Sequence, residues 1–143
     1  MKVTKQTQRN FSFFEYLDIM TTCSTGSIRI VTIYRPPPSK VNQLNRALLF
    51  EEFCTLAEHL VVSPGNLRIV GDFSYHVDDF SYHVDDISNL DTVKFNKILE
   101  SLSLVQHVNG PTHKKGHTLE LIITRAEDEL ANPVILILYR LLL

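Results

Sequence analysis

Three polar side chains stand at the ends of apolar, strand-like segments, where they could act together. They are Tyr34, Asp72 and Glu120. In open sheets, functional groups collect at the strand ends, because the backbone there is rigid while side chains still reach solvent. Two carboxylates and a phenol that converge could bind a divalent cation and activate water for phosphoryl transfer. The alternative is that the acids only accept backbone hydrogen bonds in turns.

The segments that would position these residues look like strands. Residues 27–34, 67–73 and 118–124 are short, apolar and rich in β-branched side chains, which predicts buried strands. A weaker strand is expected at 13–19. The turn-like segment 21–26 separates it from the strand at 27–34, so the two are expected to form an antiparallel pair.

Two helices are expected between these strands. The first is indicated by apolar residues at three- and four-residue spacing, namely Leu49, Phe50, Phe53, Leu56, Ala57 and Leu60. The second follows Asp91, a good N-cap, and its apolar face would be Phe95, Ile98, Leu99 and Leu102. Strands that alternate with helices predict an α/β (α+β) fold rather than an all-β sandwich.

Composition limits the class of protein. The chain has 143 residues, of which 44% are hydrophobic, so one domain with a real core is expected. Cys23 and Cys54 are too few for a disulfide scaffold and suggest a reducing compartment. We expect an intracellular protein of nucleus or cytoplasm, not secreted, because the N-terminus lacks a signal peptide. No membrane partner is expected, since no apolar run approaches the ~20 residues that a span needs.

The strand ends also match known motifs in order along the chain. These are Ile-Tyr-Arg-Pro-Pro at 33–37, Ile-Val-Gly-Asp-Phe at 69–73 and Gly-His-Thr-Leu-Glu-Leu-Ile-Ile-Thr at 116–124. They resemble the endonuclease/exonuclease/phosphatase superfamily, and above all the apurinic-endonuclease-like domain of non-LTR retrotransposons. The resemblance runs from about Phe13 to Asp128. It implies a partial two-sheet α/β sandwich with a Mg²⁺-dependent site, and DNA as the partner whose phosphodiesters an activated water attacks.

The same resemblance implies roles for individual residues. Asp72 would orient or deprotonate the attacking water, and Tyr34 would contact the scissile phosphate. Glu120 stands where the family has an Asp that supports a catalytic His. Ser74 replaces an Asn that donates to the phosphate oxygens, and loss of such a donor typically costs about 10²–10³ in rate.

Other parts of the family site have no counterpart here. The N-terminal metal-binding Glu is absent, and Glu15 is in the wrong context to replace it, so the metal ligands are unknown. The terminal Ser-Asp-His motif is also missing. These features indicate a truncated domain from a retroelement, ancestrally a Mg-dependent nuclease that nicked DNA and now inactive or weakly active. The alternatives are a non-catalytic remnant that binds nucleic acid or protein, and a phosphatase acting on lipids or small molecules.

Two polar segments could add binding groups. Residues 73–79 are repeated at 80–86, which is expected to be a loop insertion. The repeated His76, Asp78, His83 and Asp85 could ligate a metal, although duplication alone explains the pattern. Lys114, Lys115 and His117 form a small basic loop that could either touch a DNA phosphate or remain solvated.

The expected organisation has three parts. Residues 1–12 would be poorly ordered, 13–128 would be the partial domain, and 129–143 a divergent apolar tail. Missing strands would leave sheet edges open, so self-association through these edges and the 134–143 tail is expected.

Overall fold

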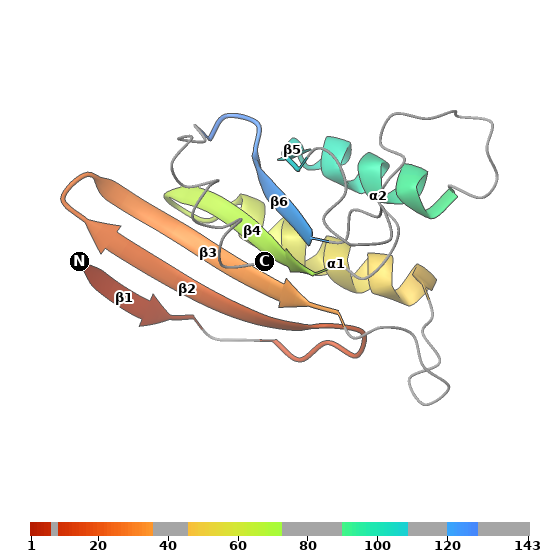
Figure 1. Cartoon of the computed structure of the whole chain (residues 1–143), viewed down its shortest axis with the longest axis horizontal. Coiled ribbons are helices and arrows are strands. Elements are labelled where there is room, and N and C mark those ends of the chain that lie inside the picture. Colours follow the sequence, from red (N-terminus) through yellow and green to blue (C-terminus); the bar gives the residue numbers. More distant parts are fainter. Residues whose placement is uncertain (7–8, 36–45, 73–89, 109–119, 129–143) are drawn as a thin grey trace.

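The computed structural model describes residues 1–6, 9–35, 46–72, 90–108 and 120–128. Its strands form one six-stranded sheet in the order β1-β2-β3-β4-β6-β5 (Figure 1). The elements are β1 (Lys2–Lys5), β2 (Glu15–Cys23), β3 (Gly26–Tyr34), α1 (Arg46–Val61), β4 (Asn66–Asp72), α2 (Leu90–Ser101), β5 (Leu104–Gln106) and β6 (Glu120–Arg125).

The sheet is mixed, which confirms the predicted α+β class. β2 and β3 form the expected antiparallel hairpin, with Cys23 opposite Gly26 at the turn. β3 pairs with β4 in parallel, and α1 lies between them in the chain. β6 then runs antiparallel to both β4 and β5.

One face of the sheet packs against both helices and forms the main core. Val31, Ile33 and Ile69 project from the strands into this core, which also contains the predicted apolar residues of the helices. Phe95 of α2 is fully buried, with its ring centroid 5.3 Å from that of Phe53 on α1. The three- and four-residue spacing seen in the sequence therefore does mark the buried helix surfaces.

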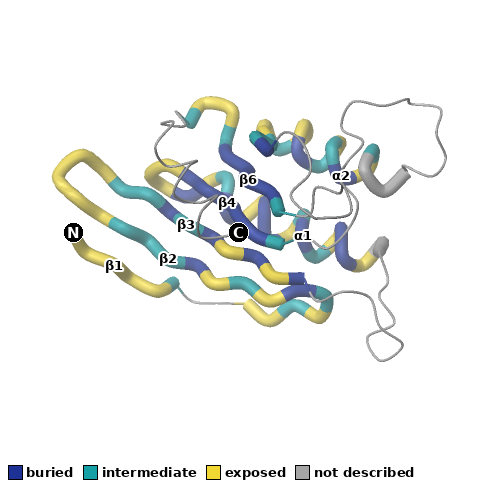
Figure 2. The backbone as a smooth tube through the Cα atoms, viewed as in Figure 1, coloured by how far each residue is buried: buried dark blue, intermediate teal, exposed yellow. Residues whose placement is uncertain are grey.

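The opposite face, called here the helix-free face, carries the alternate residues of the same strands. A small cluster of Val70, Val108 and Ile122, with Ile30 against it, lies on this face and includes no helical residue among the described ones. Residues of this face are mostly buried on β4 and β6, half-buried or exposed on β2, and exposed on β1 (Figure 2). The sheet is thus covered unevenly.

Several details differ from the sequence-based expectations. β1 and β5 were not predicted, and residues 2–5 pair with β2 although 1–12 was expected to be poorly ordered. The helix α2 begins at Leu90, one residue before the predicted N-cap. The strands of the described ranges form one sheet, so they supply only one layer of the expected sandwich. The duplicated segment 73–86 and the tail 129–143 lie outside the described residues.

Candidate functional site

The three predicted strand-end residues lie side by side in one row. Tyr34 on β3 is the register partner of Asp72 on β4, and Asp72 is the partner of Glu120 on β6. Register partners project from the same face, and this face is the helix-free one because Ile33 and Leu121 beside them enter the helical core. The backbone N–H of Arg35 donates to the Asp72 carbonyl at 3.0 Å and closes the end of the β3–β4 ladder.

Asp72, the central carboxylate of the row, is directly preceded by Gly71, and the structure shows why a glycine is needed there. Its φ is +150°, a backbone conformation that residues with a side chain rarely adopt. A Cβ at this position would overlap the carbonyl oxygen of Ile33 and lie 2.7 Å from the carbonyl carbon. The close approach of β3 and β4 therefore requires glycine, and it sets the position of Asp72 next to Tyr34.

The row is accessible and its chemistry is that of hard oxygen donors. Tyr34 is half exposed, and Asp72 and Glu120 are both half-buried. Side chains directly opposite on antiparallel strands have Cβ atoms about 4.5–5.5 Å apart. The two carboxylates are therefore close enough to act on one ligand.

The described part of the chain does not supply a full set of ligands for a metal ion. No group of three or more His, Cys, Asp or Glu side chains there could hold a metal ion. Mg²⁺ is, however, commonly bound by one or two carboxylates while substrate phosphates and water complete its octahedron. Asp72 and Glu120 fit that second mode of binding.

Glu15 extends the same row and was set aside by the sequence reasoning. It lies at the start of β2, directly opposite Tyr34 across the hairpin, and it is exposed. The register of the β2–β3 hairpin places Glu15 in the row, because pairing Cys23 with Gly26 forces Glu15 opposite Tyr34. The predicted turn at 21–26 was too broad to set that register.

A second polar group lies on the helix-free face, toward the other end of β4 and β6. The ring Nε2 of His107 is 2.8 Å from Oγ1 of Thr124, and Arg68 and Thr124 are both buried. Burial, and then the positive charge of Arg68, lower the pKa of His107 below its ordinary value of 6.5. This group is too enclosed to be part of the accessible row and holds the sheet together instead.

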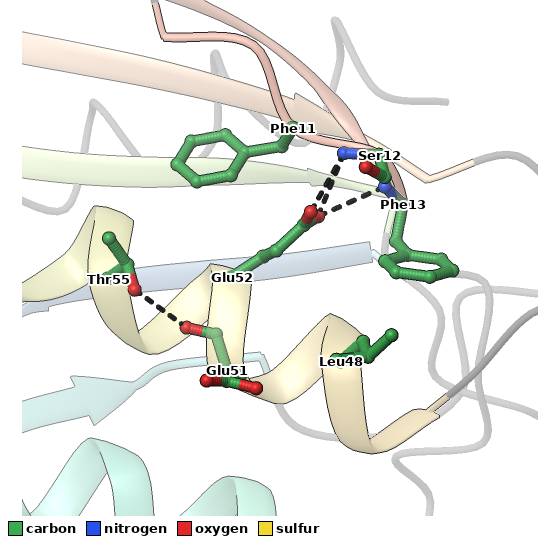
Figure 3. Close-up of a pocket in the computed structure, with 7 residues that line it drawn as sticks. All are labelled: Phe11, Ser12, Phe13, Leu48, Glu51, Glu52 and Thr55. Atoms are coloured by element: carbon green, nitrogen blue, oxygen red, sulfur yellow. Dashed lines mark hydrogen bonds between the residues drawn. The ribbon is translucent and has the colours of Figure 1, made fainter.

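A separate pocket of about 490 Å³ lies between α1 and the segment before β2. The carboxylate of Glu52 accepts hydrogen bonds from the backbone N–H groups of Ser12 and Phe13 at 2.9–3.1 Å (Figure 3). The rings of Phe11 and Phe13 line the same pocket. None of the predicted site residues lines this pocket. We infer that the hydrogen bonds of Glu52 anchor residues 11–13 to α1.

The remaining predicted residues cannot be placed. Ser74, the basic residues Lys114, Lys115 and His117, and the repeated His and Asp residues of 76–85 all lie outside the described residues. Within the described ranges, no helix is long and apolar enough to cross a membrane.

Comparison with known proteins gives a structural match only. No protein-family model matches the sequence, and no curated protein matches it either. The structure is similar to the "Endonuclease domain of TRAS1, a telomere-specific non-LTR retrotransposon", with a TM-score of 0.61 and 15% identity. That match covers 88% of this chain and 54% of the endonuclease domain.

A second solved structure is more distant. It is a β-hairpin deletion mutant of beta toxin from Staphylococcus aureus, with a TM-score of 0.48, 12% identity, and coverage of 84% of this chain and 46% of that one. The chain thus spans about half the length of the structures it matches. The match to the retrotransposon domain, together with the mixed sheet and two helices, shows an α+β fold of the endonuclease/exonuclease/phosphatase type.

Proposed function

We propose that this chain is a truncated endonuclease/exonuclease/phosphatase domain of retroelement origin, whose ancestral activity was Mg²⁺-dependent nicking of DNA. The observation that carries the proposal is the row of Tyr34, Asp72 and Glu120 in register on three neighbouring strands. The sequence motifs assign the same three residues to one site independently of the strand pairing. The fold match to a retrotransposon endonuclease domain supports the same origin.

Each residue of the row has a role that its position allows. The Asp72 carboxylate would accept a proton from, and orient, the water that attacks the phosphodiester. The Tyr34 hydroxyl, half exposed beside it, would donate a hydrogen bond to a phosphate oxygen. Asp72 and Glu120 would hold Mg²⁺, which when bound supplies positive charge against the developing charge on the phosphate.

The present activity is proposed to be weak or absent. Ser74 stands where the family has an Asn that donates to the phosphate oxygens, and the loss of such a donor costs about 10²–10³ in rate. Among the described residues, no three His, Cys, Asp or Glu side chains lie together so as to hold a metal ion. That incompleteness favours the second candidate, a remnant that binds nucleic acid without cutting it.

Nicking of supercoiled plasmid by the purified chain tests this proposal, with Mg²⁺ or with EDTA. Asp72→Asn should abolish any Mg²⁺-dependent nicking, a loss of about 10²–10⁴. Glu127→Gln removes an exposed carboxylate in the turn after β6 and should leave nicking unchanged. Circular dichroism of each variant confirms that the protein is folded.

A finer substitution probes the phenol. Tyr34→Phe keeps the ring and deletes only the hydroxyl, and it should lower nicking by about 10²–10³. If folded wild-type protein nicks no faster than Asp72→Asn, no nicking activity survives in this chain, and the remnant that binds without cutting is the candidate that remains. Electrophoretic mobility of labelled DNA then decides whether binding survives.

A further inference from the structure

Glu15 places a third carboxylate beside the residue that would contact phosphate. It is the direct register partner of Tyr34 across the β2–β3 hairpin, so both side chains project from the helix-free face. Their Cβ atoms are expected about 4.5–5.5 Å apart, as in any directly opposed antiparallel pair. Glu15 is exposed and Tyr34 is half exposed, so the carboxylate and the phenol meet solvent side by side.

The charge of Glu15 is not balanced by any described residue. Its side chain forms no hydrogen bond or ion pair within the described ranges. The basic side chains that β1–β4 present on this face are Lys5 and Arg68, and each lies four residues along the strands from the level of the row. A strand rises about 3.3 Å per residue, so both are about 13 Å or more from Glu15, which exceeds the Debye length of about 8 Å at physiological ionic strength.

A neighbouring carboxylate repels an incoming anion in proportion to the charge of that anion. A phosphate bound by the Tyr34 hydroxyl would lie between Glu15 on β2 and Asp72 on β4, because β3 separates these two strands. Mg²⁺ would bind on the Asp72 side, so the repulsion from Glu15 would remain on the other side.

The two common classes of phosphate ester differ in that charge. A phosphodiester carries one negative charge, whereas a monoester carries nearly two above its second pKa of about 6. Coulomb energy is proportional to the charge of the ligand, so Glu15 should repel a monoester about twice as strongly as a diester.

We propose that Glu15 is a specificity-determining residue of this row, which disfavours the terminal phosphate of a monoester and leaves the phosphodiester as the preferred ligand. This inference rests on the proposed function, because it takes phosphate to bind at Tyr34. It distinguishes nuclease chemistry from the phosphatase alternative by charge, and it requires no contact between Glu15 and the substrate.

Binding of two small ligands at about pH 8, with Mg²⁺ present, tests this role, since the monoester is then close to fully charged. The diester is thymidylyl-thymidine, the monoester is thymidine 5′-monophosphate, and NMR titration gives the Kd of each. Glu15→Gln should tighten the diester about threefold and the monoester about tenfold, because the effect on the logarithm of Kd doubles with the charge of the ligand. Expressing each Kd relative to that of the wild type cancels the contacts of the bases.

Matched variants separate the charge of Glu15 from other effects. Glu15→Asp keeps the charge and should keep the wild-type preference. Glu127→Gln removes an exposed carboxylate in the turn after β6, at the far end of that strand from the row, and should change neither Kd. Tyr34→Phe should weaken both ligands, which locates their binding at the row.

Salt provides a readout that a merely structural role of Glu15 would not change. At about 1 M salt the Debye length falls to about 3 Å, so the difference between the wild type and Glu15→Gln should disappear. A difference that persists at this salt concentration overturns the electrostatic role.

The remaining outcomes separate this inference from the proposed function. An equal gain for both ligands in Glu15→Gln, or no gain, overturns the role of Glu15 but leaves the row as a phosphate site. Ligands that bind as well to Tyr34→Phe, or that do not bind at all, overturn the inference together with the placement of phosphate at the row. An absence of nicking bears only on the proposed function, because these titrations measure binding without cleavage.

Discussion

The two faces of the sheet use the same strands for different purposes. On the helix-covered face, Val31, Ile33 and Ile69 pack against α1 and α2 in a continuous core. On the helix-free face, the neighbouring residues along the same strands include the partly exposed Leu17 and Ile30 and the row of Tyr34, Asp72 and Glu120. Because side chains alternate along a strand, one backbone can supply a core on one face and an accessible polar row on the other.

The two faces also differ in how far their charged side chains are buried. Asp18 and Arg29 form a bidentate ion pair on the helix-covered face, with distances of 2.6 and 2.9 Å, and both side chains are buried. The carboxylates of the row remain partly open to solvent. The Asp18–Arg29 pair is thus enclosed away from solvent, whereas the row of carboxylates keeps contact with solvent.

The largest expected loss of stability is at the centre of the covered face. Phe95→Ala removes a fully buried ring that lies 5.3 Å from Phe53 and 6.4 Å from Phe50, measured between ring centroids. Such a cavity costs about 3–5 kcal/mol. Urea denaturation followed by circular dichroism measures this loss, and a loss below about 1 kcal/mol would show that α2 is not integral to the core.

A pair of glycine substitutions compares close packing with backbone strain alone. Gly71 and Gly26 both have positive φ, at +150° and +140°, so alanine is strained at either position. Only at Gly71 would the new Cβ meet neighbouring backbone, since nothing lies within 4 Å at Gly26. Overpacking should make Gly71→Ala more destabilising than Gly26→Ala by about 1–3 kcal/mol. Equal losses in thermal denaturation would contradict the close approach of β3 and β4.

His107 provides a smaller, pH-dependent effect on the helix-free face. Its pKa is lowered in the folded protein by burial and by Arg68, so the unfolded chain binds the proton more readily. The contribution of neutral His107 to the free energy of unfolding should therefore be fully present above the ordinary pKa of 6.5. It should be lost as the pH falls from that value toward the lower pKa of the folded protein. His107→Gln should remove this part of the pH dependence. Subtracting the variant's profile of stability against pH from that of the wild type isolates the contribution of His107 from those of the other histidines.

The smallest effect is expected where the helix-free face is open. Leu17→Ala truncates a side chain that is 44% exposed, and it should change stability by no more than about 0.5 kcal/mol. Thermal denaturation of the dilute protein measures this. A loss comparable to that of Phe95→Ala would mean that the two faces are equally covered.

Much of the molecule could be predicted from local patterns in the chain. The strands β3, β4 and β6 were expected within two residues of their observed bounds, because their apolar runs are visible without knowing their partners. The predicted helix stripes proved to be the buried surfaces of α1 and α2 for the same reason. β1 and β5 were missed, since strands of four and three residues carry too few residues to show a pattern.

The sequence by itself therefore determined which segments form strands and helices, and it placed Tyr34, Asp72 and Glu120 at strand ends. Only the tertiary structure decided that these three residues share one row, that Glu15 extends it, and that one sheet face is left open. The physical reason is that periodicity is a property of neighbouring residues, whereas register depends on pairing between segments far apart in the chain.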